Sequence, residues 1–202
     1  MNYDLLINLI IIINIVLTFS ANLPLAGQTF RKKLQPVLTK PKSYLQNVPK
    51  YISSLIFLLI IAGLFGLGKI EIKDELIQVI RTIFAGLYVL FSWLQILAAK
   101  NLGEFYTQDI VIYKDHKLID KGFYKIIRHP VYLTQILQDL FAGLALANYL
   151  IIPLTLFIEF PLYVLRTNFE EKILTKNLAE YKEYANRTGK WFPKVRILKT
   201  QI

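Results

Sequence analysis

The stretch 121–137, KGFYKIIRHPVYLTQIL, contains the side chains of this chain that are best suited to chemistry. His129 carries an imidazole, which can gain or lose a proton near neutral pH. Pro130 comes next and an apolar run follows it, and proline is favoured in the first turn of a helix, where its missing N–H costs nothing. The sequence therefore predicts a helix that begins at Pro130. The free N–H groups and positive dipole end of that helix favour a carboxylate or a phosphate.

A second group of ionisable side chains lies further along the chain. Arg166 follows the last apolar run, and Glu170 and Glu171 come about one helical turn later. The helix from Pro130 and the run before Arg166 are joined by a short turn at Asn148, so we expect them to be antiparallel neighbours. Their ends should then bring together a helix N-terminus, an imidazole, a guanidinium and two carboxylates. This group suits a ligand with both a carboxylate and an ammonium.

The elements that must position these residues are strongly apolar. The chain has 202 residues, of which 54% are hydrophobic. The apolar residues form five long runs, at 5–19, 51–67, 76–99, 131–147 and 150–165. A membrane-spanning helix needs roughly 17–25 residues, so the third run is long enough alone and the others need their flanks. We predict an all-α, polytopic membrane protein with about five transmembrane helices and an amphipathic helix between residues 169 and 184.

The formal net charge of +10 follows the loops between these runs. Residues 21–50 carry basic side chains and no acidic one, and residues 100–130 and the segment from 166 onward are also rich in Lys and Arg. Basic loops stay cytoplasmic, so we predict an N-terminus outside and a cytoplasmic C-terminus. Arg81 lies a short way inside the third run and is expected to extend back to the outer interface. The basic residues are expected to attract membrane lipids, and no nucleic-acid partner is expected.

Composition also limits metal chemistry and domain number. The chain has no cysteine and two histidines, so no metal site is predicted. Residues 1–202 are expected to form a single membrane-embedded domain, in which 1–99 is a three-helix membrane portion and 100–195 is the catalytic and cofactor-binding region. The first run lacks a preceding basic segment and a clear cleavage pattern, so we interpret it as a retained helix and not as a signal peptide.

The motifs between residues 100 and 195 resemble those of the isoprenylcysteine carboxyl methyltransferase family and its phospholipid methyltransferase relatives. The family pattern is Leu-Val-x-x-Gly-x-Tyr-x-x-x-Arg-His-Pro-x-Tyr, then Arg-x-x-x-Glu-Glu, then Tyr-x-x-Tyr and a late proline. The matching residues are Leu118, Ile119, Gly122, Tyr124, Arg128, His129, Pro130, Tyr132, Arg166, Glu170, Glu171, Tyr181, Tyr184 and Pro193. Thr134 stands where the family usually has a glycine, and we expect it to narrow the pocket or to alter the substrate.

The resemblance implies an enzyme that transfers a methyl group from S-adenosylmethionine (SAM) to a lipidic or prenylated acceptor at the cytoplasmic membrane face. The residues it implies for the cofactor are His116, Lys117, Leu118, Ile119, Tyr124, His129, Pro130, Val131, Tyr132 and Glu170. It implies that Arg166 engages the substrate. A carboxylate acceptor is ionised at neutral pH and needs no base, whereas an amine or thiol acceptor would make His129 or Glu171 the candidate base.

Two further carboxyl groups, Asp139 and Glu159, fall inside the last two apolar runs. They lie nine residues before and eleven residues after Asn148, so antiparallel helices would bring them to a similar depth. Ionisable groups inside a membrane span are costly and usually serve a function. We expect them to face inward, to share a proton or hydrogen bonds, and to line a polar route for substrate. The alternative is a purely structural polar contact.

Two other functions remain open from the sequence. Membrane lipid or steroid reductases that use NADPH share a related Arg-His-Pro-Asn-Tyr motif, but this chain has Val131 in place of the asparagine and Gln135 where a glutamate would follow. A non-enzymatic transporter or assembly subunit would leave the convergence of Arg166, Glu170 and His129 unexplained. The sequence therefore favours a methyltransferase and leaves its acceptor unidentified.

Overall fold

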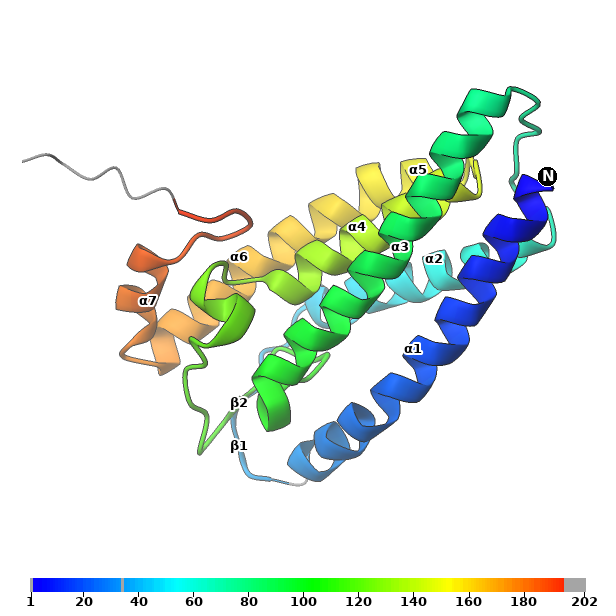
Figure 1. Cartoon of the computed structure of the whole chain (residues 1–202). Helices are drawn as coiled ribbons and strands as arrows, with labels where there is room; N and C mark the ends of the chain where they lie inside the picture. The colour runs from blue at the N-terminus through cyan, green and yellow to red at the C-terminus, as the bar shows by residue number, and fades with distance from the viewer. Residues whose placement is uncertain (1, 34, 195–202) are drawn as a thin grey trace, which may run out of the picture.

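The protein is described by a computed structural model that covers residues 2–33 and 35–194, which are mostly helical (Figure 1). The elements in chain order are α1 (Tyr3–Lys33), β1 (Val37–Thr39), η1 (Tyr44–Gln46), α2 (Val48–Leu64), α3 (Glu75–Leu102), η2 (Gly103–Phe105), β2 (Ile112–Tyr113), η3 (Gly122–Lys125), α4 (Pro130–Ala145), α5 (Ile151–Leu154), η4 (Thr155–Glu159), α6 (Phe160–Asn177) and α7 (Tyr181–Arg187). The last residue of the predicted region 100–195 lies outside the described residues. The all-α prediction needs one correction, because β1 and β2 pair as a small antiparallel sheet, with Val37 opposite Tyr113.

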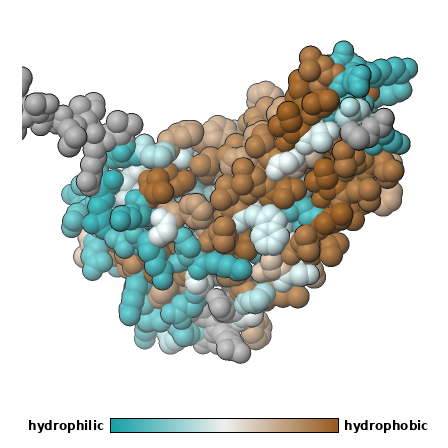
Figure 2. Space-filling view, viewed as in Figure 1, coloured by the Kyte–Doolittle hydropathy of each residue, from teal (hydrophilic) through white to brown (hydrophobic). Residues whose placement is uncertain are grey.

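Three helical segments are long and apolar enough to cross a membrane, namely Tyr3–Gly27, Tyr44–Leu64 and Glu75–Phe105. They correspond to the first three predicted spans. Figure 2 shows a broad hydrophobic belt along the helices, with hydrophilic residues gathered at the two ends. Helix α4 has 16 residues and is shorter than the roughly 20 that a span needs. The count of five spans, and the N-terminus outside, therefore stay predictions.

The helices pack around a core that joins the first half of the chain to the second. Its fully buried members include Ile7 of α1, Ile56 of α2, Ala85 of α3 and Leu146 after α4. Large apolar side chains elsewhere on these helices, such as Phe19 at 69% exposure, point away from the core. Exposed apolar surface of this extent on helices of membrane-spanning length is what contact with lipid requires.

The turn between α4 and α5 is organised by Asn148, which is fully buried. Its Nδ2 donates to the carbonyl of Leu67 at 2.7 Å, and its Oδ1 accepts from the N–H groups of Leu150 and Ile151 at 3.0 and 3.1 Å. One amide side chain thus satisfies the backbone where the chain reverses. The predicted hairpin is present, and α5 and η4 return beside α4 from this turn before the chain continues into α6 (Figure 1).

Arg81 does not extend to the outer interface, so that expectation is wrong. It is 3% exposed and donates to Asp4 at 2.8 Å, to Gln78 at 2.6 Å and to the carbonyl of Ala145 at 2.9 Å. These acceptors lie on three helical segments that meet around the guanidinium. Arg81 therefore joins the start of α1, α3 and the end of α4 in place of reaching the headgroups.

The C-terminal part forms two helices, α6 and α7, where a single amphipathic helix was predicted. Helix α6 continues to Asn177, Leu178 has an extended conformation, and α7 begins at Tyr181. The backbone then returns to the start of α4, where Ile127 pairs with Gly189 in a parallel bridge. Helix α7 and the start of α1 lie at opposite ends of the molecule (Figure 1).

Candidate functional site

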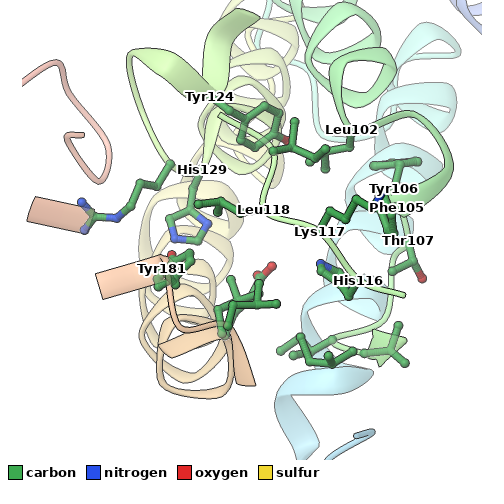
Figure 3. Close-up of a pocket in the computed structure, with 18 of the residues that line it drawn as sticks. Leu102, Phe105, Tyr106, Thr107, His116, Lys117, Leu118, Tyr124, His129 and Tyr181 are labelled. Atoms are coloured by element: carbon green, nitrogen blue, oxygen red, sulfur yellow. The ribbon is translucent and has the colours of Figure 1, made fainter. Parts of the chain in front are cut away.

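A cavity, here called the loop cavity, lies between the 102–131 region and the α6–α7 segment (Figure 3). Residues from both sides of the sequence meet around it because α7 folds back toward the start of α4. Of the ten residues predicted for the cofactor, those that line it are His116, Lys117, Leu118, Ile119, Tyr124, His129, Val131, Tyr132 and Glu170. Pro130 is buried as the first residue of α4 and is not part of this lining. Burial and the negative charge of Glu170 raise the pKa of Tyr124 well above its usual value, so its phenol stays protonated.

The loop that carries these residues depends on Gly122 for its path. Gly122 has a φ of +57°, in the left-handed region, and a Cβ there would lie 1.7 Å from Oδ1 of Asn101. That oxygen accepts a hydrogen bond from the N–H of Phe123 at 3.0 Å. The close approach fixes η3 against the end of α3 and so positions Tyr124 in the loop cavity.

We expect Gly122→Ala to lower the free energy of unfolding by about 2 kcal/mol. A non-glycine residue in the left-handed region costs roughly 1–2 kcal/mol, and the displaced Asn101 would also lose its hydrogen bond. Thermal unfolding of the purified protein measures the loss. Gly86→Ala is the matched control, because a Cβ there meets nothing within 4 Å. Equal melting temperatures for the two variants would show that Gly122 has no special conformational role.

A second cavity, here called the helix cavity, lies among α2, α3, α4 and α6. The residues that line it are Lys50, Ser53, Ser54, Phe57, Leu58, Gln95, Tyr106, Thr107, Gln108, Val131, Tyr132, Gln135, Gln138, Asp139, Tyr163 and Arg166. Four of them also line the loop cavity, namely Tyr106, Thr107, Val131 and Tyr132. The two cavities therefore adjoin along these four residues, here called the shared wall. Tyr106 and Thr107 in that wall were not among the predicted residues, because nothing in the sequence distinguishes them from other loop positions.

A short chain of hydrogen bonds runs through this wall. The hydroxyl of Tyr132 donates to Oε2 of Glu170 at 2.8 Å and accepts from Nε of Arg166 at 3.0 Å. The guanidinium of Arg166 also lies 5.5 Å from the centre of the Tyr132 ring. One phenol thus links a carboxylate in the loop cavity to a cation in the helix cavity.

Arg166 is 2% exposed and is held mainly by backbone carbonyl groups. Its Nη1 donates to the carbonyls of Leu45 and Gln46 at 2.7 and 3.2 Å, and its Nη2 donates to that of Gln108. With Nε bonded to Tyr132, these bonds use four of the five guanidinium N–H groups and leave one on Nη2. Arg166 forms no ion pair with a carboxylate of the described residues. A buried cation of this kind favours an anionic ligand.

Glu171 lies outside the lining of the loop cavity and binds three basic side chains. Its Oε1 accepts from Arg128 at 2.8 Å and contacts Nε2 of His129 at 3.0 Å, and its Oε2 accepts from Lys190 at 3.2 Å. Burial alone would raise the pKa of Glu171, but the hydrogen bonds from His129 and Arg128 lower it to about 2. A carboxylate with this pKa has little affinity for a proton at neutral pH, and its contacts suit a positioning role, whereas its role as a base for an amine or thiol acceptor stays a prediction.

Arg128 extends this cluster to the C-terminal segment. Its Nη1 donates to the carbonyl of Ala185 at 3.0 Å and also to that of Thr188. The imidazole of His129, 5% exposed, stacks against Tyr132 with ring centres 5.7 Å apart and lies 6.0 Å from the ring of Trp191. The Arg128-His129 pair therefore holds the segment after α7 against the start of α4.

Asp139 and Glu159 are buried, at 2% and 0% exposure, as expected for inward-facing groups. Asp139 lines the helix cavity, whereas Glu159 lies behind it in the π-helical segment η4. This segment precedes Pro161, whose ring cannot continue a regular α-helix past the carbonyl four residues earlier, so a local π turn is the physical consequence. The two carboxyl groups interact electrostatically.

Thr134 does not narrow either cavity. Its hydroxyl donates to the carbonyl of Pro130 at 2.8 Å, one turn earlier in α4, and its side chain is buried. It is absent from the lining of both cavities. The expectation that Thr134 narrows the pocket is therefore wrong, because its hydroxyl bonds within the first turn of its own helix, whereas an effect on the substrate stays a prediction.

Comparison with known proteins connects this geometry to a family. Residues 84–176 match the profile of the isoprenylcysteine carboxyl methyltransferase (ICMT) family. A stretch of 87 residues is 33% identical to the cobalt-zinc-cadmium resistance protein CzcN of Cupriavidus metallidurans, and it covers 42% of this chain and 39% of that protein. The chain thus matches less than half the length of this relative. The region matched by the family contains the shared wall, Arg166 and the Glu170-Glu171 pair.

Proposed function

We propose that the protein is an integral membrane methyltransferase that uses SAM and methylates a lipidic carboxylate, because residues 84–176 match the profile of the ICMT family. The observation that carries the proposal is the shared wall of the two cavities. Two reactants held in these adjoining cavities would bring their reacting atoms together beside Tyr132 and Val131. One cavity is lined mainly by loops and α6–α7, and the other lies among helices of membrane-spanning character.

The loop cavity has the chemical groups that SAM requires. When bound, SAM supplies a methyl group on a positively charged sulfur. Glu170 offers a carboxylate for an ammonium or for ribose hydroxyls, and its proximity to Tyr132 places this charge beside the shared wall. The rings of Tyr106, Tyr124 and Tyr132 suit an adenine and attract a sulfonium through their faces. We assign the residues that line this cavity to SAM, with His116, Lys117, Leu118 and Ile119 on the loop side.

The helix cavity is assigned to the acceptor. Arg166 lines this cavity beside Tyr132 and keeps one Nη2 N–H, which would bind the acceptor carboxylate. The cavity is bounded by α2 and α3, two of the helices that are apolar enough to span a bilayer, so a lipidic acceptor would reach it from the membrane. SAM would arrive from the cytoplasm, which places the reaction at the cytoplasmic face.

The reaction is a displacement at the methyl carbon. A carboxylate oxygen forms a bond to that carbon while the carbon–sulfur bond breaks and its electron pair remains on sulfur, which becomes a neutral thioether. The carboxylate is already ionised, so no side chain has to remove a proton. The protein contributes by alignment and exclusion of water, and orientation alone can supply roughly 7–11 kcal/mol. Arg166 and Tyr132 are the residues that would align the acceptor.

Calorimetric titration with S-adenosylhomocysteine tests the cofactor assignment. We expect the detergent-purified protein to bind it, and Glu170→Ala to weaken binding at least tenfold by removing the carboxylate beside Tyr132. Glu71→Ala is the matched control, because Glu71 is 81% exposed in the loop between α2 and α3. Absence of binding to a folded parent would refute the use of SAM, and titration with NADPH would then test a reductase.

A further inference from the structure

The helix cavity contains more charge than the transfer of a methyl group to a carboxylate uses. Arg166 lines it next to Tyr132, and Asp139 lines it further along α4. Tyr132 and Asp139 are seven residues apart in one helix, which separates them by about 10 Å along its axis. The cavity is thus positive near the shared wall and acidic at its deeper end.

The acidic end lacks a cation within the part of the chain that the structure describes. Asp139 accepts from Nε2 of Gln135 at 2.7 Å, and Oε1 of Glu159 accepts from Oγ of Ser53 at 2.7 Å. The carboxyl groups of Asp139 and Glu159 lie within hydrogen-bond distance of each other, and Oε2 of Glu159 has no other hydrogen-bond partner among the described residues. Neither carboxyl group forms an ion pair with a described Lys, Arg or His. Buried carboxyl groups without a cation are costly, so a donor bound in the cavity would stabilise them.

We propose that the acceptor carries a protonated amine in addition to its carboxylate, and that Asp139, with Glu159 behind it, binds the amine while Arg166 binds the carboxylate. This inference rests on the proposed function, because it specifies the class of acceptor for the same site. A ligand with opposite charges about 10 Å apart matches the separation along α4. A neutral lipid chain would bury the carboxyl group of Asp139 against apolar groups without supplying a cation.

Three eight-carbon probes separate the two ends of the cavity. The probes are octanoate, octylamine and 8-aminooctanoate, titrated by calorimetry into the detergent-purified full chain loaded with S-adenosylhomocysteine. The extended bifunctional probe has its charges about as far apart as the two ends of the cavity. We expect it to bind at least tenfold more tightly than octanoate. Asp139→Asn and Glu159→Gln should each remove most of this preference and leave the affinity for octanoate unchanged.

Glu75→Gln is the matched control, since Glu75 is exposed in the first turn of α3, outside both cavities. Equal affinities of the parent for octanoate and 8-aminooctanoate would overturn the proposal and indicate a carboxyl pair that only shares a proton. A preference that survives both substitutions would also overturn it. The comparison of octanoate with 8-aminooctanoate uses the parent protein alone, so the proposal can still be tested if a variant misfolds. Failure of S-adenosylhomocysteine to bind would instead refute the proposed function, which separates the two failures.

Discussion

Arg166→Lys is expected to reduce methyl transfer by at least about 100-fold in protein that remains folded. Lysine keeps the charge, but its ammonium has three donors at one point and cannot reproduce a planar guanidinium that bonds on several sides. Nη1 and Nη2 bind carbonyls from two separate segments, and Nε holds Tyr132. Misplacement of a reacting group by about 1 Å typically costs on the order of 100-fold in rate. The assay is transfer of radiolabelled methyl from SAM to lipid extracted from the source membranes.

The same substitution should also lower stability, because it leaves carbonyl groups of Leu45, Gln46 or Gln108 without a donor. Each unsatisfied buried group costs roughly 1–3 kcal/mol, so a loss of several kcal/mol is expected. Arg187→Lys is the matched control, since Arg187 is 45% exposed and forms one ion pair with Asp120 at 2.6 Å. Rates are compared at a temperature at which circular dichroism shows both variants to be folded. A rate that falls only in proportion to the folded fraction would make the role of Arg166 purely structural.

The sequence predicted the identity of the important residues better than their roles. The apolar runs predicted three spans that the structure confirms by length and composition. Nine of the ten residues predicted for the cofactor, all except Pro130, line one cavity, because the chain turns back at Asn148 and brings α6 to the start of α4. Their assignment to SAM stays a prediction. Local patterns succeed here because helix length, a turn residue and a proline at the start of a helix act over short sequence distances.

The contacts that the sequence did not predict are made at long range. Arg166 binds carbonyls of residues that lie 58 to 121 positions away, and backbone oxygen atoms have no signature in the sequence. Arg81 illustrates the same limit, because its acceptor on Ala145 is also a carbonyl. The prediction for Thr134 was wrong for a different reason, because the contact that it overlooked is local. Its own helix satisfies the hydroxyl, so a difference from the family pattern did not change the cavity.

Glu171→Gln is the second substitution with a large expected effect. The carboxylate binds Arg128, His129 and Lys190, and it is 20% exposed. An amide keeps the shape but donates as well as accepts, so it cannot match three basic groups. We expect a loss of about 3 kcal/mol in the free energy of unfolding, which is the shift from a pKa of 4.5 to about 2 expressed as an energy. Affinity for S-adenosylhomocysteine should fall as well, because His129 lines the loop cavity.

The dependence of stability on pH provides an independent test of the stabilisation that the Glu171 carboxylate supplies. The pKa of Glu171 is lower in the folded protein than in the unfolded chain, so its stabilisation is complete above about pH 5 and is lost as the pH falls toward 2. Asp109, whose pKa is also about 2 because Lys40 and Lys50 outweigh its burial, loses stabilisation over the same range in both proteins. The contribution of Asp109 is the same in the parent and in Glu171→Gln, so it cancels when the melting temperature of the variant is subtracted from that of the parent. This difference should be several degrees at pH 7 and should narrow steadily between pH 5 and pH 2. A difference that stays constant over this range would show that the charge of Glu171 does not hold the C-terminal segment against α4.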